Sequence, residues 1–237
     1  MAGLFYLKEC KSTNDEISTF LHSESTDLTA VYTFHQTNGR GQYGNMWESA
    51  PDLNLAFTVA VPVADFGGGS TFVNFRTAAL LTDFLAKLTN VKVEIKWPND
   101  LIIKNKKIGG ILSEQKNVDG KTFFVIGIGL NLLQENFENL PKAGSLLTQT
   151  GVALDPDDTA HSLFAVLGGL KEVFSESELM ETININLYRK DAVSVFELNG
   201  VRQNGIIKYV DDEGFLWVDL ESGGTQKFFH KEIELLY

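Results

Sequence analysis

The stretch from residue 91 to residue 128 narrows most sharply the folds open to this chain. Apolar and charged residues alternate from Val91 to Trp97, and Pro98 ends the run. A period of two predicts a strand with one buried face. Further apolar runs, separated only by short turns, follow at 101–103, 107–113 and 122–128. Because short turns join antiparallel neighbours, this part of the chain predicts an antiparallel sheet and not a doubly wound one.

Helical patterns appear on both sides of these strands. From Ser70 to Asn90, apolar residues recur at intervals of three and four, and Asn90 stands where a C-terminal cap belongs. Thr13 and Glu16 have capping-box spacing after a short strand expected over 4–9. Asp155 followed by Pro156 is typical of a helix start, with a buried stripe that extends to Phe174. A further helix is expected over 178–188.

The pattern changes near Ala192, after which only short strands and turn signals remain. This spacing predicts a small β-barrel appended to a larger unit. The fold class is therefore α+β, with a mixed, largely antiparallel sheet and packed helices. We expect two domains, 1–190 and 191–237.

Charge and cysteine content exclude several classes of protein. Lys and Arg total 20 against 31 Asp and Glu, so the net charge is −11 and DNA binding is disfavoured. Cys10 is the single cysteine, which rules out an intramolecular disulfide and a cysteine-based zinc site. The N-terminal residues do not resemble a leader, and no apolar run is long enough to span a bilayer. We therefore expect a cytoplasmic protein that is not bound to membranes.

The segment from Gly39 to Gly44 matches the dinucleotide-binding pattern of three spaced glycines. That pattern needs a helix to begin at the last glycine, whereas residues 45–51 have turn and strand character. Backbone N–H groups in such a loop, together with Arg40, can instead form a phosphate site. The alternative is a hairpin loop with a solvated arginine.

Three other segments contain residues that are candidates for binding a ligand. Lys107 precedes the paired glycines 109 and 110, an arrangement that brings an ammonium near a phosphate, although lysine-rich turns are common. Glycines inside the strand at 127–131 indicate close approach of a ligand or of another backbone, or a bulge. Ser12, Thr13 and Asn14 are explained equally well as helix-capping residues or as ligand-binding ones.

Taken in order, these segments resemble the motif series of the biotin–protein ligases. The resemblance covers about residues 4–135, with its most specific part at Lys96–Asp100 and 107–112, and the C-terminal tail is similar to that family's SH3-like domain. It implies a catalytic domain like that of class II aminoacyl-tRNA synthetases. The family type implied is one that lacks an N-terminal DNA-binding domain.

The resemblance also implies a role for each matching residue. Ser12, Thr13, Asn14 and Gln36 would bind biotin, and Arg40 with its glycines would bind the biotin carboxylate and the α-phosphate. Lys107 would neutralise the charge that develops there, Trp47 would pack near adenine, and Asn131 would line the pocket floor. Asp100 is the candidate to position a lysine or assist proton transfer. The other substrate-binding candidates are Gly39, Gly41, Gln42, Lys96, Asn99, Gly109, Gly110, Gly127 and Gly129.

The activity implied is formation of biotinyl-5'-AMP from biotin and ATP, with Mg²⁺, followed by transfer of biotin to a lysine. The acceptor would be the biotin carboxyl carrier domain of a carboxylase. Gln42 departs from the family, which commonly has a second cation at this position. The sequence leaves open whether the protein forms a homodimer. The competing functions are a lipoate–protein ligase or octanoyl transferase, and a non-catalytic binding module.

Overall fold

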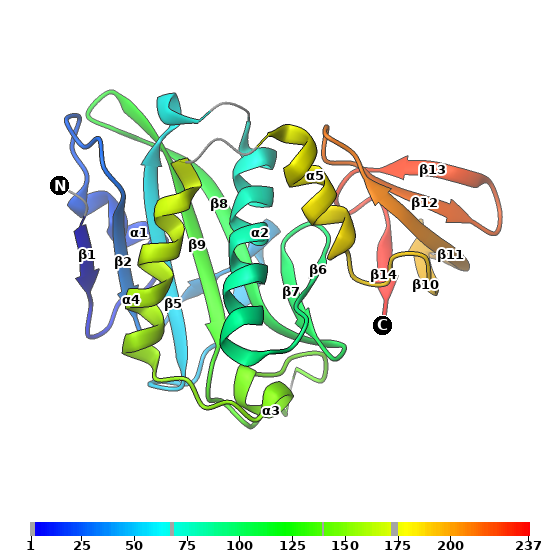
Figure 1. The fold of residues 1–237 in the computed structure, drawn as a ribbon, viewed down its shortest axis with the longest axis horizontal. Helices are drawn as coiled ribbons and strands as arrows, with labels where there is room; N and C mark the ends of the chain where they lie inside the picture. The colour runs from blue at the N-terminus through cyan, green and yellow to red at the C-terminus, as the bar shows by residue number, and fades with distance from the viewer. Residues whose placement is uncertain (1–2, 67–68, 139, 172–174) are drawn as a thin grey trace.

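The computed structural model describes residues 3–66, 69–138, 140–171 and 175–237 (Figure 1). Its centre is a seven-stranded sheet in the order β1-β2-β5-β9-β8-β7-β6. The strands of this sheet are β1 (Gly3–Tyr6), β2 (Thr29–Thr33), β5 (Asn54–Pro62), β6 (Glu94–Lys96), β7 (Asp100–Ile103), β8 (Lys106–Val118) and β9 (Lys121–Asn131).

The antiparallel sheet predicted between residues 91 and 128 is confirmed. β6 pairs with β7, β7 with β8, and β8 with β9, all antiparallel. The β8–β9 turn has Asp119 and Gly120 at positive φ, which suits the twist of a tight hairpin. β1 and β2 are the parallel exception, because α1 (Thr13–Glu16) and a 3₁₀ turn cross over between them.

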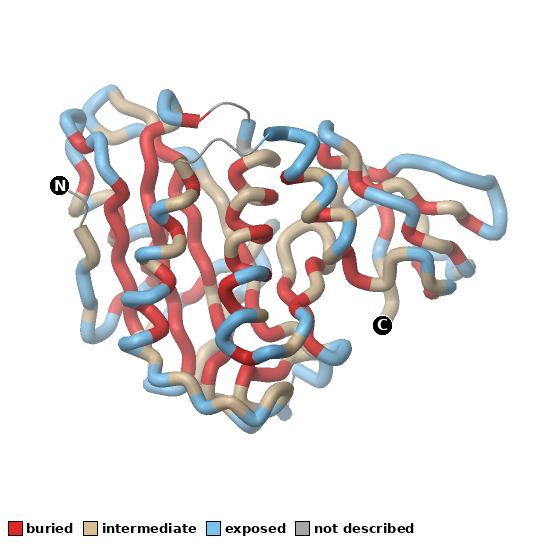
Figure 2. The backbone as a smooth tube through the Cα atoms, viewed as in Figure 1, coloured by how far each residue is buried: buried red, intermediate tan, exposed pale blue. Residues whose placement is uncertain are grey.

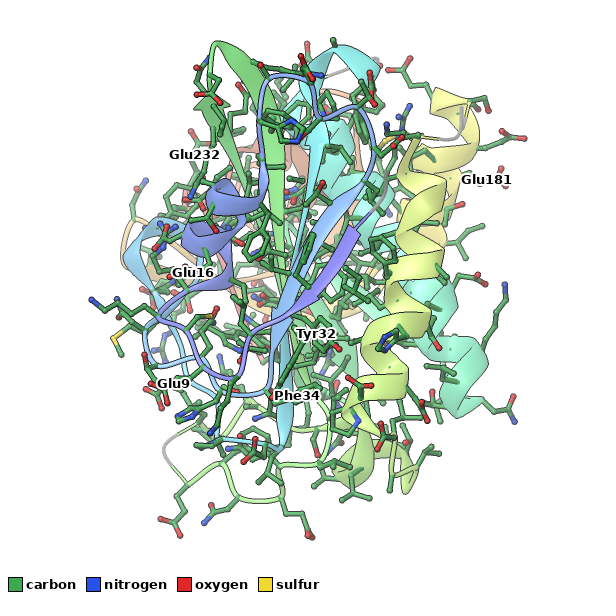
Figure 3. All side chains as sticks on the ribbon, turned by 90° about the vertical axis from the view of Figure 1, so that its left-hand side faces the viewer. Glu9, Glu16, Tyr32, Phe34, Glu181 and Glu232 are labelled. Atoms are coloured by element: carbon green, nitrogen blue, oxygen red, sulfur yellow. The ribbon has the colours of Figure 1, made fainter. Side chains whose placement is uncertain are left out.

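Helices cover both faces of this sheet (Figure 3). α2 (Ser70–Thr89) and α4 (Pro156–Leu167) pack on one face, and α1 packs on the other. The side chains of β2 therefore alternate between two cores: Tyr32 joins the α2 and α4 side, and Val31 joins the α1 side. The inner strands are buried along most of their length (Figure 2).

Most of the predicted helix ends are confirmed. α2 ends at Asn90, which is left-handed with φ 55°, and α4 begins at Asp155, whose side chain accepts from two backbone N–H groups. The capping box between Thr13 and Glu16 is wrong: Ser12 occupies the N-cap and makes no side-chain cap bond.

Two element ends also differ from expectation. β1 stops at Tyr6 instead of residue 9. α5 (Glu176–Ile185) ends before the predicted Tyr188. The Ile95 N–H donates to the Asn186 carbonyl, and the Tyr188 N–H donates to the Ile95 carbonyl, so the backbone of 186–188 pairs with β6 instead of continuing the helix. Phe174 and most of the loop at 67–69 lie outside the described residues.

A five-stranded antiparallel sheet follows α5, in the order β13-β12-β11-β10-β14. Phe196 and Ile207 of this sheet belong to the same core cluster as Leu101 of the larger one, so the two sheets share a continuous core. The described residues include no helix long and apolar enough to cross a membrane. The strands are β10 (Val193–Leu198), β11 (Val201–Val210), β12 (Leu216–Leu220), β13 (Gly224–Phe228) and β14 (Glu234–Leu236).

Candidate functional site

A cavity of about 630 Å³ lies where the larger sheet, the glycine-rich segment and the C-terminal sheet meet. The glycine-rich segment forms a two-stranded hairpin of β3 (Gly39–Arg40) and β4 (Met46–Trp47). All but three of the residues singled out in the sequence line this cavity. The predicted residues that line the cavity are Ser12, Thr13, Asn14, Gln36, Arg40, Gly41, Gln42, Trp47, Lys96, Asn99, Asp100, Lys107, Gly110, Gly127 and Gly129.

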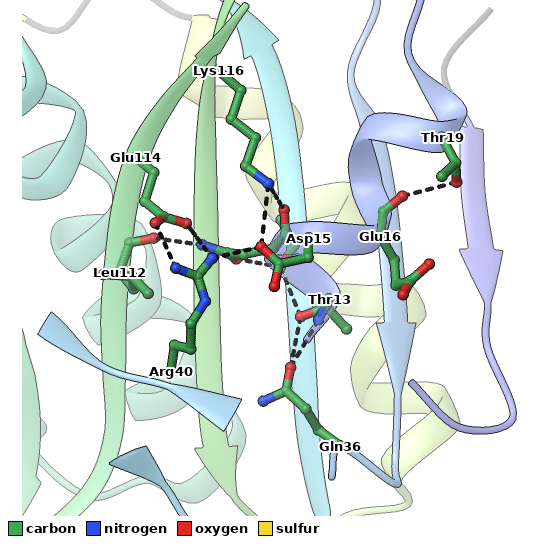
Figure 4. A network of polar contacts seen from close by, with 11 residues as sticks. Thr13, Asp15, Glu16, Thr19, Gln36, Arg40, Leu112, Glu114 and Lys116 are labelled. Atoms are coloured by element: carbon green, nitrogen blue, oxygen red, sulfur yellow. Dashed lines mark hydrogen bonds and ion pairs between the residues drawn. The ribbon is translucent and has the colours of Figure 1, made fainter. Parts of the chain in front are cut away.

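One end of the cavity is built from uncharged polar side chains. The Thr13 backbone N–H donates to Gln36 Oε1 at 2.9 Å, which joins the start of α1 to the segment after β2 (Figure 4). The Thr58 hydroxyl lies 2.7 Å from Asn14 Oδ1 and 2.8 Å from Thr13 Oγ1. Asn14 and Thr13 are each only 3% exposed. Buried groups held in this way are positioned to select hydrogen-bonding partners on a small ligand.

The other end of the cavity carries two lysines around one carboxylate. Asp100 Oδ1 lies 2.6 Å from Lys107 Nζ, and Asp100 Oδ2 lies 3.8 Å from Lys96 Nζ. The hairpins create this group, because Asp100 pairs with Lys96 on β6 and with Gly110 on β8. Burial lowers the pKa of Lys96, and the charges of Lys107 and Lys142 lower it further, while Asp100 opposes the shift.

The structure also distinguishes Lys107 from its neighbouring lysines. Lys104 is exposed at a turn, and Lys106 Nζ donates to the Pro141 carbonyl. Lys107 Nζ instead faces the cavity and lies 5.7 Å from the centre of the Trp47 ring. Asp100 therefore orients the one lysine of this turn that lines the cavity.

Two glycines in the cavity wall, Gly127 and Gly129, make room for the protein's own side chains, whereas a Cβ on Gly110 would stand at ordinary contact distance from its neighbours. A Cβ on Gly127 would lie 3.0 Å from Asn14 Cγ and closer still to its Oδ1. On Gly129 it would lie 2.6 Å from Trp47 Cζ2, and on Gly110 it would lie 3.5 Å from Lys107 Nζ. The close approach predicted at 127 and 129 is present, and in this structure side chains of Asn14 and Trp47 make it.

Three predicted residues do not line the cavity, and each has a packing role. A Cβ on Gly39 would collide with the Trp47 carbonyl, and one on Gly109 would press against Leu130. Asn131, expected on the pocket floor, is buried and donates to the Gly144 carbonyl at 2.9 Å. The Gly144 N–H in turn donates to the Lys107 carbonyl, so Asn131 supports the Lys107 backbone from behind.

Arg40 does not lie at the lysine end of the cavity. Its guanidinium donates to both carboxylate oxygens of Glu114 at 3.1 Å and to Asp15 Oδ1 at 2.7 Å (Figure 4). Lys116 completes the network, donating to the Asn14 carbonyl at 2.6 Å and lying 3.5 Å from Asp15. Glu114 and Asp15 could not be predicted as partners of Arg40, because nothing local to either residue in the sequence marks that contact.

The connection between β13 and β14 supplies a second group, for which the sequence carries no local signal. The His230 ring stacks on Tyr43 of the glycine-rich segment at 4.5 Å, and Lys231 Nζ lies 4.4 Å from the same Tyr43 ring. Burial lowers the pKa of His230, and the nearby charges of Lys231 and Lys96 act in the same direction. Both His230 and Lys231 line the cavity, so the C-terminal sheet forms part of its wall.

The sequence profile of the biotin/lipoate A/B protein ligase family matches residues 6–131, more than half of the chain. The chain belongs to this family. The match begins in the first strand and ends at the last residue of β9, so it contains the polar end, the lysine end and the glycine-rich segment of the cavity.

Known members of the family are similar over much of this chain. The biotin–[acetyl-CoA-carboxylase] ligase of Mycobacterium tuberculosis is 29% identical over 88% of this chain and 80% of its own length. The bifunctional ligase/repressor BirA of Escherichia coli is 28% identical over 61% of this chain, which spans only 46% of that protein.

Solved structures extend the likeness in fold beyond the profile match. The biotin protein ligase of Aquifex aeolicus, solved in complex with biotin and ATP, superimposes with a TM-score of 0.80 at 22% identity. The match covers 99% of this chain and 98% of that one, so both sheets share the arrangement found in that enzyme.

Proposed function

We propose that this protein is a biotin–protein ligase that forms biotinyl-5'-AMP from biotin and ATP and transfers biotin to a lysine of a carrier domain. The observation that carries the proposal is the division of one cavity into two chemically different ends. Thr13, Asn14 and Gln36 supply buried hydrogen-bonding groups for a small polar ring, and Lys107 and Lys96 supply cations for phosphate. Membership of the ligase family and the 29% identical biotin–[acetyl-CoA-carboxylase] ligase support it.

The first step places most of its demand on electrostatics. A biotin carboxylate oxygen attacks the α-phosphorus of ATP, and pyrophosphate leaves with the bonding electron pair. Lys107, oriented by Asp100, is placed to stabilise the negative charge on the phosphate oxygens. Trp47 lines the same region, and its buried Nε1 donor has no partner among the described residues. An unpaired donor in a cavity wall supports a polar ligand at that position.

The second step needs no nucleophile from this protein. The ε-amine of an acceptor lysine attacks the activated carbonyl carbon of biotin, and AMP leaves. Holding the two reactants together supplies much of the rate in such reactions. Cys10 is unsuited to a covalent route, because burial and three nearby carboxylates raise the pKa of its thiol to about 11.

The remaining partners follow from the same proposal. Mg²⁺ is proposed to accompany ATP, because phosphate oxygens are ligands that this ion prefers. The acceptor is the biotin carboxyl carrier domain of a carboxylase, and the net charge of −11 argues against DNA as a partner. Residues 1–190 and 191–237 are proposed as the two domains.

The decisive experiment is exchange of labelled pyrophosphate into ATP, measured separately with biotin, lipoate and octanoate. We expect exchange with biotin only. Exchange with lipoate or octanoate but not biotin would assign the protein to the lipoate branch of its family. Exchange with none of the acids would refute the proposal and leave an octanoyl transferase or a binding module.

A further inference from the structure

Thr58 is a polar residue in an apolar part of the larger sheet. It lies within β5, paired with Val31 on one side and with Gly127 on the other. Its side chain is 0% exposed and lies on the face that packs against α1, where the buried neighbours Val31, Ala60 and Val125 are apolar. Valine would fill the same space without a hydroxyl. Because burial of a hydroxyl costs free energy unless it is hydrogen-bonded, the partners of this one decide its role.

The hydroxyl of Thr58 contacts two residues at the start of α1. Its oxygen lies 2.7 Å from Asn14 Oδ1 and 2.8 Å from Thr13 Oγ1. Thr58 is not among the described residues that line the cavity, whereas Thr13 and Asn14 both line it. The Thr58 hydroxyl therefore acts on a ligand through these two side chains.

The Glu114 carboxylate fixes the direction of these hydrogen bonds. A carboxylate only accepts, so the atom of Asn14 that lies 2.8 Å from Glu114 Oε2 is the amide nitrogen. The amide oxygen of Asn14 then faces Thr58, and because it also only accepts, Thr58 donates to it. A hydroxyl has a single hydrogen, so in the contact between Thr58 and Thr13 the Thr13 hydroxyl is the donor.

The Thr13 hydroxyl consequently has no hydrogen left for a ligand. Its other neighbour, Gln36 Oε1, is farther away at 3.2 Å and already accepts from the Thr13 backbone N–H at 2.9 Å (Figure 4). Thr13 Oγ1 therefore presents a lone pair to the cavity, where it accepts a hydrogen bond and cannot donate one.

We infer that Thr58 is a positioning residue that makes the Thr13 hydroxyl a hydrogen-bond acceptor, so that this end of the cavity selects an acid whose ring carries an N–H group. The inference rests on the proposed function and deepens it. The urea ring of biotin has N–H groups, whereas lipoate and octanoate have none. An acid without an N–H group at this position leaves the buried Thr13 oxygen unpaired, which weakens its binding.

The test is Thr58→Val, which keeps the shape of the side chain and removes the hydroxyl. Thr13 then loses its acceptor and turns its hydrogen toward Gln36 or toward the ligand. The ligands are biotin and two analogues of biotin, each with a different ring N–H replaced by an oxygen atom. The replacement puts an acceptor in place of a donor and keeps the ring size. Calorimetric titration gives the Kd of each ligand.

We expect the wild-type protein to bind one of the two analogues about tenfold more weakly than biotin, since two acceptors then face each other at Thr13. In Thr58→Val, the Kd for biotin should rise about tenfold, while the Kd for that analogue changes less than about threefold. The preference for biotin over that analogue should therefore fall below about threefold. The Kd for ATP should stay within about twofold, because the hydroxyl contacts of Thr58 lie at the polar end.

Two variants are controls. Thr58→Ser keeps the hydroxyl and should retain both the affinity for biotin and the preference. Thr77→Val is the matched control for loss of a buried hydroxyl, because Thr77 is also 0% exposed but donates to the Val73 carbonyl of its own helix at 2.7 Å. It should leave the constants for all ligands unchanged. If Thr58→Val fails to fold, Thr58→Ala removes the same hydroxyl and the same preference is measured.

Equal weakening of biotin and of both analogues in Thr58→Val would overturn the inference, because Thr58 would then only support the packing of α1. Equal binding of biotin and both analogues by the wild type would overturn it too. Failure of the proposed function is a separate result, seen as no binding of biotin by the wild type. In that case nuclear Overhauser effects in the free protein still locate the Thr58 hydroxyl proton, either toward Asn14, as inferred, or toward Thr13, which would contradict the inference.

Discussion

Substitution of Gly127 by alanine tests the most tightly packed contact of the cavity wall. The added methyl group would lie 3.0 Å from Asn14 Cγ and 3.1 Å from its Nδ2, inside ordinary van der Waals contact, and closer still to Oδ1. Asn14 is only 3% exposed, and its amide is hydrogen-bonded on both sides, so the methyl group meets a side chain that is already fixed. The substitution must therefore push Asn14 off its hydrogen-bond partners, Thr58 at 2.7 Å and Glu114 at 2.8 Å.

The cost follows from those two hydrogen bonds. Each buried polar group left without its partner costs about 1–3 kcal/mol, and alanine recovers about 0.4–1 kcal/mol by restricting the unfolded chain. We expect the free energy of unfolding to fall by about 2–4 kcal/mol in urea titrations of Gly127→Ala. The Kd for biotin should rise at least tenfold in calorimetric titration, because Asn14 belongs to the polar end.

Gly168→Ala is the control for this substitution. Gly168 has a right-handed helical backbone at the end of α4, and a Cβ there would meet no atom within 4 Å. This variant should be as stable as the wild type or slightly more so. If Gly127→Ala unfolds within about 0.5 kcal/mol of the wild type, Asn14 has room to move and the packing argument is refuted.

Three further predictions concern charge. Lys107→Ala should reduce the rate of pyrophosphate exchange at least about a hundredfold, while the Kd for biotin stays within threefold of the wild type. Lys104→Ala should exchange at near the wild-type rate, and an equal loss of exchange in both variants would remove the special role of Lys107. Gln42→Arg should slow escape of biotinyl-AMP about tenfold in a chase experiment, and an unchanged rate would contradict it. Burial lowers the pKa of His230 from 6.5, so the neutral ring is favoured in the folded state. The free energy of unfolding should therefore fall as pH drops below about 6.5 through the folded pKa, and His230→Phe should lack that component; an identical pH profile would refute it.

Local sequence signals predicted the larger sheet and most helix ends because the physics behind them is local. Alternation from Val91 to Trp97 and short turns were sufficient for the hairpins, and Asn90 and Asp155 mark their helix ends through backbone geometry alone. Thr13 shows where such signals fail. Its spacing to Glu16 suits a capping box, yet its backbone N–H and hydroxyl are engaged by Gln36, far away in the sequence.

The candidate site was predicted less evenly, since its contacts join distant segments. Arg40 and Glu114 are 74 residues apart, and Tyr43 stacks on His230 of the connection between β13 and β14. Nothing in the sequence around Glu114 distinguishes it from a solvated carboxylate. The glycine at 127 was recognised as a point of close approach, but only the fold shows that Asn14 fills the space.

These long-range contacts change what the glycine-rich segment can do. On its sequence alone, the segment is a loop whose arginine is free to meet phosphate. In the folded protein the segment forms a hairpin whose arginine is paired with Glu114 of β8 and whose Tyr43 is stacked on His230, between β13 and β14. The arginine therefore lines the cavity already paired with Glu114 and Asp15, so its charge is partly compensated before any ligand binds.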